Sequence, residues 1–273
     1  MGAFSDRVWY AVAVTVYGLA AAHGLTLWRR GSARGGWMNY AWLATGFAAH
    51  TVALMGRGFS LQRCPVTNLF EALMFLSWAI CGTYLAVGLW GRLRFLSVFL
   101  APGLLVTGLL ALQPRLDAPG PDFDLERWAL SLHVVFILLG YAAFGLAALA
   151  AAVLLVREPS EREVAERSPA RRLPSPADLE QALVRSLAAG LVLLTAGLAI
   201  SFGLMRERYG VAIRPDPKIA WSALVWAVYL GLVVARLRFG RPARAFAWGA
   251  LGGFVFVLLT FWGTNLLSPI HHP

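Results

Sequence analysis

Eight long apolar segments, separated by short polar connections, dominate the hydrophobicity pattern of the chain. They cover residues 7–28, 38–56, 69–91, 95–113, 128–156, 183–205, 219–237 and 243–267. Several of them exceed the roughly 18 uncharged residues that a helix needs to cross a lipid bilayer. The pattern therefore predicts an all-α fold, a polytopic membrane helix bundle with about eight transmembrane helices.

Composition agrees with this prediction, and charge adds an orientation. The chain is 59% hydrophobic and 14% charged, with a mean hydropathy of +0.64, which a soluble domain could not bury. The net charge of +10 does not indicate nucleic-acid binding, because the basic residues cluster beside the apolar segments. Of the 24 basic residues, 15 lie on the side of the connections after the first, third, fifth and seventh segments. This excess places those connections in the cytoplasm and both termini outside.

One connection is much longer and more polar than the others. Residues 157–181 combine mixed charge with four prolines, which is typical of a mobile linker. We found no internal repeat. The expected organisation is therefore a single membrane domain over residues 1–273, with a polar cytoplasmic linker at about 157–181.

The loop between the second and third apolar segments carries several polar residues. Pro65 stops a helix from running through it, and Asn68 is placed to cap the next helix. Glu71 falls in the first turn of that helix, where an exposed carboxylate contributes roughly 0.3–1 kcal/mol through the helix dipole. We assign Glu71 to structure first, pairing with Arg57 or Arg63 to hold the loop.

The histidines are unevenly distributed across the predicted membrane. His50 and His133 lie in the outer halves of their segments, His271 and His272 follow the last segment, and His23 lies toward the cytoplasm. Neutral imidazole binds haem iron, zinc or copper, or forms hydrogen bonds within a bundle. Both readings stay open for each single histidine. His133 together with His271 or His272 could take opposite faces of one iron.

Basic side chains are also present on the predicted outer side. They could pair with the two propionates of a haem, or with lipid headgroups. These residues are Arg57, Arg63, Arg206, Arg208, Arg214 and Lys218.

Four stretches resemble, in order, the motifs of the CcsA/HemX-like cytochrome c assembly proteins. They are PVTNLFEALMFLSW (65–78), LSLHVVFILLGYAAF (130–144), DPKIAWSALVWAVYL (216–230) and FWGTNLLSPIHH (261–272). Together they extend over about two-thirds of the chain.

The resemblance implies a multi-pass protein of the bacterial inner membrane that binds haem b and delivers or holds it for attachment to apocytochrome c. It assigns His133 as the first external haem ligand and His271 or His272 as the second. It assigns His50 as an in-membrane haem ligand, and Asp216 as the aspartate that closes an external tryptophan-rich motif. A ResB-like membrane partner is also implied.

The same resemblance leaves the enzyme question open. The chain could be part of a cytochrome c synthase (haem lyase) complex, yet it needs no catalytic residue of its own. Thioether formation uses the cysteines of the cytochrome and the vinyl groups of haem.

One motif departs from the family pattern. Where the tryptophan-rich motif is expected, this chain reads RERYGVAIRPDP (206–217). Haem would therefore need other shielding, for which Tyr209, Trp128 and Trp262 are candidates, with Arg206, Arg208 and Arg214 on the propionates. The departure also favours a second reading, a HemX-like regulatory or scaffold protein of the haem pathway without transport activity. A small-molecule transporter is a third reading, although the sequence shows no inverted repeat.

Overall fold

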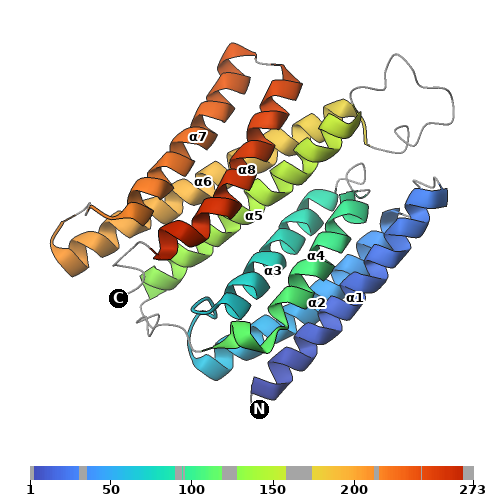
Figure 1. The fold of residues 1–273 in the computed structure, drawn as a ribbon, viewed down its shortest axis with the longest axis horizontal. Helices are drawn as coiled ribbons and strands as arrows, with labels where there is room; N and C mark the ends of the chain where they lie inside the picture. Colours follow the sequence, from blue (N-terminus) through green and yellow to red (C-terminus); the bar gives the residue numbers. More distant parts are fainter. Residues whose placement is uncertain are drawn as a thin grey trace. The chain divides into compact units, whose positions relative to one another are not determined.

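The computed structural model describes residues 3–30, 36–89, 94, 96–118, 128–157, 174–211, 215–240 and 242–266. Within these residues the chain forms eight α-helices and one 3-10 helix, with no strand (Figure 1). The all-α prediction is confirmed. The elements are α1 (Ala3–Arg30), α2 (Gly36–Leu61), α3 (Leu69–Gly88), α4 (Ser97–Ala111), η3 (Pro114–Asp117), α5 (Trp128–Arg157), α6 (Pro176–Tyr209), α7 (Pro217–Phe239) and α8 (Ala243–Leu266).

Two helices extend well beyond the apolar segments that predicted them. Helix α2 continues to Leu61, because Arg57 is buried among carboxylates and so does not end the helix. Helix α6 begins at Pro176, where proline suits a first turn. Ser175 caps it, since its Oγ accepts a hydrogen bond from the backbone N–H of Asp178. The connection between α5 and α6 is therefore shorter than the predicted 157–181, and its residues 158–173 lie outside the described residues.

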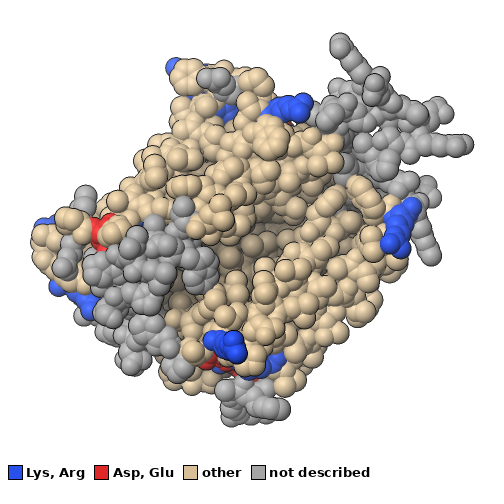
Figure 2. All heavy atoms as spheres, in the orientation of Figure 1, with Lys and Arg blue, Asp and Glu red and all other residues tan. Residues whose placement is uncertain are grey.

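The chain is a multi-pass membrane protein. By length and composition, five of the described helices could cross a membrane, namely α1, α3, α5, α6 and α7. Within the described residues, the apolar parts of α4 and α8 are shorter than these five helices. Helix α2 is not among the helices that are both long and apolar enough to cross a membrane. In Figure 2 the visible Lys, Arg, Asp and Glu atoms lie near the ends of helices, and the surface along the helices is uncharged. That eight helices span the bilayer, with both termini outside, stays a prediction.

The backbone divides into two compact units. Unit 1 comprises Met1–Gly120 and Val156–Ala182, and therefore contains α1 to α4 and η3. Unit 2 comprises Pro121–Leu155 and Leu183–Pro273, and therefore contains α7, α8 and most of α5 and α6. The single domain over residues 1–273 stays a prediction.

Unit 1 is built around α1, which packs along both α2 and α4. Its core contains large aromatic side chains, among them Tyr10, Tyr17 and Phe70, each at most 1% exposed. Gly46 of α2 lies directly against the ring of Tyr17, so a larger residue there would collide with it. The aromatic core leaves few ways to arrange these helices, and it brings polar groups of different helices together.

Unit 2 has a close helix crossing of its own. Gly140 of α5 faces Gly190 of α6, and a Cβ atom on Gly140 would lie 3.2 Å from the carbonyl oxygen of Gly190. Helix α7 joins this pair through Phe144 and Tyr229, whose rings stack with centroids 3.8 Å apart. Helix α8 packs against α7. Small residues in the crossing allow the backbones of α5 and α6 to approach closely, as is common in membrane proteins.

Candidate functional site

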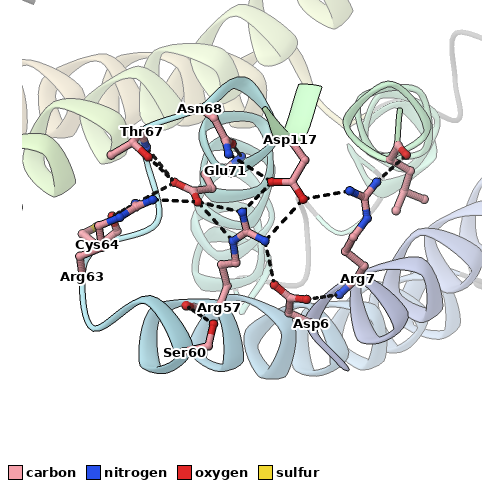
Figure 3. A network of polar contacts seen from close by, with 11 residues as sticks. Asp6, Arg7, Arg57, Ser60, Arg63, Cys64, Thr67, Asn68, Glu71 and Asp117 are labelled. Atoms are coloured by element: carbon pink, nitrogen blue, oxygen red, sulfur yellow. Dashed lines mark hydrogen bonds and ion pairs between the residues drawn. The ribbon is translucent and has the colours of Figure 1, made fainter. Parts of the chain in front are cut away.

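One end of unit 1 carries a network of charged side chains, half of them buried and half partly buried, which we call the ionic network (Figure 3). Its three arginines and three carboxylates have charges that cancel. They come from α1, α2, the α2–α3 loop, α3 and η3. The members are Asp6, Arg7, Arg57, Arg63, Glu71 and Asp117.

Glu71 is a centre of the ionic network and is completely buried. Its Oε1 accepts a hydrogen bond from Arg57 Nη2 at 3.1 Å, and its Oε2 accepts one from Arg63 Nη1 at 2.9 Å. The backbone N–H of Thr67 also donates to Oε2, at 2.8 Å. The Oδ1 atom of Asn68 accepts the backbone N–H of Glu71 at 2.8 Å, so Asn68 caps α3. Glu71 thus pairs with both candidate arginines.

Arg57 is the second centre of the network, and its side chain is 9% exposed. Its guanidinium contacts carboxylates of three different segments: Glu71, Asp6 at 3.3 Å and Asp117 at 2.6 Å. Arg57 therefore ties α1, α3 and η3 to α2.

These contacts correct two expectations. Arg57 and Arg63 are paired with carboxylates, so they are not the propionate partners that the sequence suggested. Glu71 is buried, so the small value for an exposed carboxylate at a helix end does not apply to it. Removing one partner of a buried pair typically costs about 3–5 kcal/mol, because the other charge is left uncompensated.

The ionic network contains residues that sequence reasoning missed. Asp6, Arg7 and Asp117 are far apart in the chain and come together only through the packing of α1, α4 and η3. Two signals were present in the sequence. Asp6 is an acidic residue at the edge of an apolar segment, and Asp117 lies in the connection that follows the fourth apolar segment.

Cys64 and Pro65 lie in the loop that the network holds. Pro65 is buried, and the Cys64 thiol is free and partly buried. Burial and the nearby Glu71 carboxylate raise the pKa of the Cys64 thiol to about 11. At neutral pH this thiol is therefore protonated and a poor nucleophile or metal ligand. No group of three or more His, Cys, Asp or Glu side chains forms a metal site among the described residues.

A measurement of alkylation checks this assignment. Cys81, the other cysteine in the sequence, is replaced by alanine so that only Cys64 can react. Cys64 should then react with iodoacetamide at pH 7.5 about a hundredfold more slowly than an exposed cysteine, because its thiolate fraction is that much lower. Its rate should keep rising about tenfold per pH unit beyond pH 9. A rate that levels off near pH 9 would contradict the raised pKa.

His50 lies in the middle of unit 1 and is fully buried. It shares a buried face of α2 with Arg57, two turns further on. The Tyr17 hydroxyl lies 3.1 Å from His50 Nδ1, and the Tyr10 ring lies 4.9 Å from the imidazole, centroid to centroid. His50 Nε2 is buried without a hydrogen-bond partner, in the part of the chain that the structure describes. The backbone of Met74 also lies close enough to interact with the His50 ring.

His133 is held differently, in unit 2. It is partly buried on α5, and its Nδ1 lies 2.8 Å from the carbonyl oxygen of Gly197 on α6. A carbonyl only accepts, so Nδ1 carries the proton and donates it. In the neutral ring the lone pair is then on Nε2, the usual arrangement for a histidine that ligates a metal through Nε2. His133 thus fits an axial ligand of haem iron.

Asp216 has a structural role that the sequence reading did not anticipate. Its Oδ1 accepts the backbone N–H of Lys218 at 2.9 Å and that of Ile219 at 3.3 Å, so it is the N-cap of α7. Pro217 occupies the first helical position, which completes a helix start signal. Lys218 interacts electrostatically with His133. The start of α7 therefore brings a cation near the candidate ligand.

The remaining candidates are described only in part. Arg206 and Arg208 are exposed at the end of α6, and the Arg208 guanidinium lies 5.7 Å from the ring centroid of Tyr209. The structure does not describe the side chains of Trp128 and Trp262. Arg214, His271 and His272 lie outside the described residues. The predicted pairing of His133 with a C-terminal histidine stays a prediction.

Comparison with known proteins identifies relatives for this arrangement. The chain is 27% identical over 242 residues to protein NrfI of Wolinella succinogenes, which covers 82% of this chain but 25% of NrfI. It is 24% identical over 272 residues to the cytochrome c biogenesis protein CcsA of Gloeobacter violaceus, covering 80% of each. It is 27% identical over 281 residues to CcsA of Synechococcus sp. (strain CC9311), covering 92% of each.

The family comparison spans more of the chain than any single motif. The family model described as cytochrome C assembly protein matches residues 66–272. This range includes the end of the loop held by the ionic network, Glu71, His133, the cap of α7 and the C-terminal histidines. The chain belongs to the cytochrome c assembly protein family.

Proposed function

We propose that this chain handles haem in cytochrome c biogenesis, holding haem b near the outer face of the membrane for attachment to apocytochrome c. The observation that carries the proposal is the hydrogen bond from His133 Nδ1 to the Gly197 carbonyl, which leaves Nε2 with the lone pair. When bound, haem supplies two reactive parts. Its iron takes imidazole ligands, and its vinyl groups can form thioethers.

Several residues of unit 2 hold haem in this proposal. His133 provides an axial nitrogen, and His271 or His272 provides the second. Lys218 stands near His133, and Arg206, Arg208 and Arg214 supply further cations for the propionates, because charged hydrogen bonds to carboxylates are strong. Tyr209, Trp128 and Trp262 are the aromatic side chains proposed to cover the haem.

His50 provides a second position for haem, inside unit 1. It is buried, and its Nε2 has no partner among the residues described. Asp216 acts on the site by starting α7 and so placing Lys218. No residue of the chain performs covalent catalysis in this proposal. Positioning of haem and apocytochrome is the contribution of the protein.

The family and the relatives named as cytochrome c biogenesis proteins support a proposed setting for the chain. We place the chain in the bacterial inner membrane, with a ResB-like membrane protein and apocytochrome c as partners. It acts as one part of a cytochrome c synthase complex.

A HemX-like regulatory or scaffold role is the second candidate. The observation that favours it is the absence of tryptophan from residues 206–217, where the family motif carries several. In that case the protein would modulate enzymes of the haem pathway without transporting haem, and it would be colourless when purified.

Optical spectroscopy of the protein purified in detergent tests the proposal. The wild-type protein should show a Soret band of bis-imidazole haem. His133→Ala should lower haem occupancy at least tenfold, and added imidazole should restore it, because a small ligand can fill the vacated axial position.

His23→Ala is the matched control. His23 is a partly buried histidine of unit 1 that contacts Asn39, and its replacement should leave occupancy unchanged. Equal haem retention by the two variants would contradict the assignment of His133, and a colourless wild-type protein would favour the regulatory role.

A further inference from the structure

We infer that Gly197 is a positioning residue for His133. Its carbonyl oxygen sets which ring nitrogen of His133 carries the proton, and its missing side chain lets α5 and α6 approach closely enough for that hydrogen bond. The inference rests on the proposed function, because it concerns the presentation of Nε2 to haem iron.

The hydrogen bond to the Gly197 carbonyl fixes the tautomer of His133. The distance of 2.8 Å between Nδ1 and the Gly197 oxygen is that of a well-formed N–H···O bond. A carbonyl oxygen has two lone pairs, so this one can accept from the imidazole as well as from the helix backbone. The bond also fixes the rotation of the ring, since α6 provides a stationary acceptor. Nε2 is then the nitrogen that can bind a metal.

The space between α5 and α6 at Gly197 is too narrow for a side chain. A Cβ atom on Gly197 would lie 2.7 Å from Ile137 Cδ1, 3.0 Å from Ile137 Cγ1 and 3.3 Å from the Ile137 backbone nitrogen. Ile137 lies one turn after His133 on the same face of α5. A side chain at position 197 would therefore push on the part of α5 that carries His133. A displacement that lengthens this distance beyond about 3.2 Å would weaken the hydrogen bond.

The backbones of α5 and α6 also approach closely at other positions of this crossing. Gly190 and Gly197 are seven residues apart, so they lie on the same face of α6. A Cβ atom on Gly140 of α5 would lie 3.3 Å from the backbone nitrogen of Leu194, which stands between them. The carbonyl of Gly197 is thus brought to His133 by backbone packing, and no side chain of α6 is required.

The consequence for haem follows from the chemistry of imidazole. A hydrogen bond donated from Nδ1 makes Nε2 a stronger electron donor to the metal and orients the ring. Loss of such a partner typically weakens metal binding by about 10–100-fold. We therefore expect Gly197→Ala to weaken haem binding by about tenfold and to raise the reduction potential of the bound haem.

The hydrogen bond can be tested in the protein without haem. Nitrogen-15 NMR of labelled histidine, assigned by comparison with His133→Gln, should show that the wild-type His133 is protonated at Nδ1. Gly197→Ala should convert part of the population to the tautomer protonated at Nε2. A wild-type His133 protonated at Nε2 would overturn the inference even if Gly197→Ala does not fold.

Two further variants separate positioning from general damage to α6. Gly203→Ala is the matched control, because a Cβ atom there would meet nothing within 4 Å. It should leave the tautomer, the affinity and the potential unchanged. Adding Ile137→Ala to Gly197→Ala removes the two closest collisions and should restore most of the affinity and the Nδ1–H tautomer.

The outcomes distinguish this inference from the proposed function. A wild-type protein that binds no haem would remove the proposed function, and haem binding that does not depend on His133 would remove the role of His133 in it, whatever the tautomer of His133. Haem binding that depends on His133 but is unchanged in Gly197→Ala, with the Nδ1–H tautomer retained, would overturn the role of Gly197 alone. Equal losses in Gly197→Ala and Gly203→Ala would also overturn it.

Discussion

Replacing Arg57 by methionine is expected to lower the free energy of unfolding by about 3–5 kcal/mol, the cost of leaving buried charges uncompensated. Methionine fills much of the same volume, so the loss is electrostatic and not a cavity. Arg57 contacts Asp6, Glu71 and Asp117, and the first two are at most 3% exposed. Without it three carboxylates would share two arginines. Unfolding in detergent, followed by tryptophan fluorescence, measures the change.

Arg115→Met is the control for this variant. Arg115 belongs to η3, next to the ionic network, but it is exposed. Exposed charges contribute roughly 0–1 kcal/mol, so its replacement should have a small effect. A change of less than about 1 kcal/mol in Arg57→Met would show that the buried network does not stabilise unit 1 in the way the burial of its charges implies.

Replacing Glu71 by glutamine should destabilise the protein by about 3 kcal/mol, more than its position at a helix start alone would suggest. Glu71 accepts from Arg57, Arg63 and Thr67, through both of its oxygens. In glutamine one oxygen becomes an NH₂ group, which would face donors whichever way the amide is turned. The variant also leaves three arginines with two carboxylates. Accumulation in the membrane and unfolding in detergent both measure the effect.

The double variant Arg57→Met/Glu71→Gln tests whether the two residues act as one unit. Contacting residues are not additive, so the double variant should lose clearly less stability than the sum of the single losses. Additive losses in the double variant would contradict a direct interaction between Arg57 and Glu71.

The ionic network gives the family motif in residues 65–78 a physical role. Its proline, asparagine and glutamate lie in a loop and helix start that are held by buried charges from α1, α2 and η3. The guanidiniums of Arg7 and Arg57 lie over the ring of Phe70, next to Glu71, with their Cζ atoms 5.1 and 5.3 Å from the ring centroid. The Tyr10 ring contacts both Phe70 and His50. A change in the network would therefore reach His50 through adjacent side chains.

Much of the secondary structure could be predicted from the order of apolar and polar residues. Helices in a membrane satisfy their own backbone hydrogen bonds, so a long apolar run has few other solutions. The boundaries that were missed have local causes. Helix α2 runs past residue 56 because Arg57 finds carboxylates on other helices, and α6 starts at Pro176 because Ser175 caps it.

The candidate site was less predictable, and particular residues show why. Asp216 was assigned from a family motif, whereas its position before Pro217 also marks a helix start, which the structure shows it to cap. The role of Gly197 has no sequence signal, because the group that contacts His133 is a backbone carbonyl. Asp6 and Asp117 look like ordinary polar ends of apolar segments until α1 and η3 bring them to Arg57.

By itself, the sequence determined that this is an all-α membrane protein. It also determined that Pro65 interrupts the helix and Asn68 caps the next one, and which histidines are candidate ligands. Those properties depend on local composition and on helical spacing. Only the tertiary structure decided that Arg57 and Arg63 are occupied by carboxylates, that Glu71 is buried, and that His133 is protonated at Nδ1. Each of these depends on groups from separate helices meeting within about 3 Å. Such meetings are set by the packing of aromatic rings and glycines between helices, which hydrophobic periodicity does not encode.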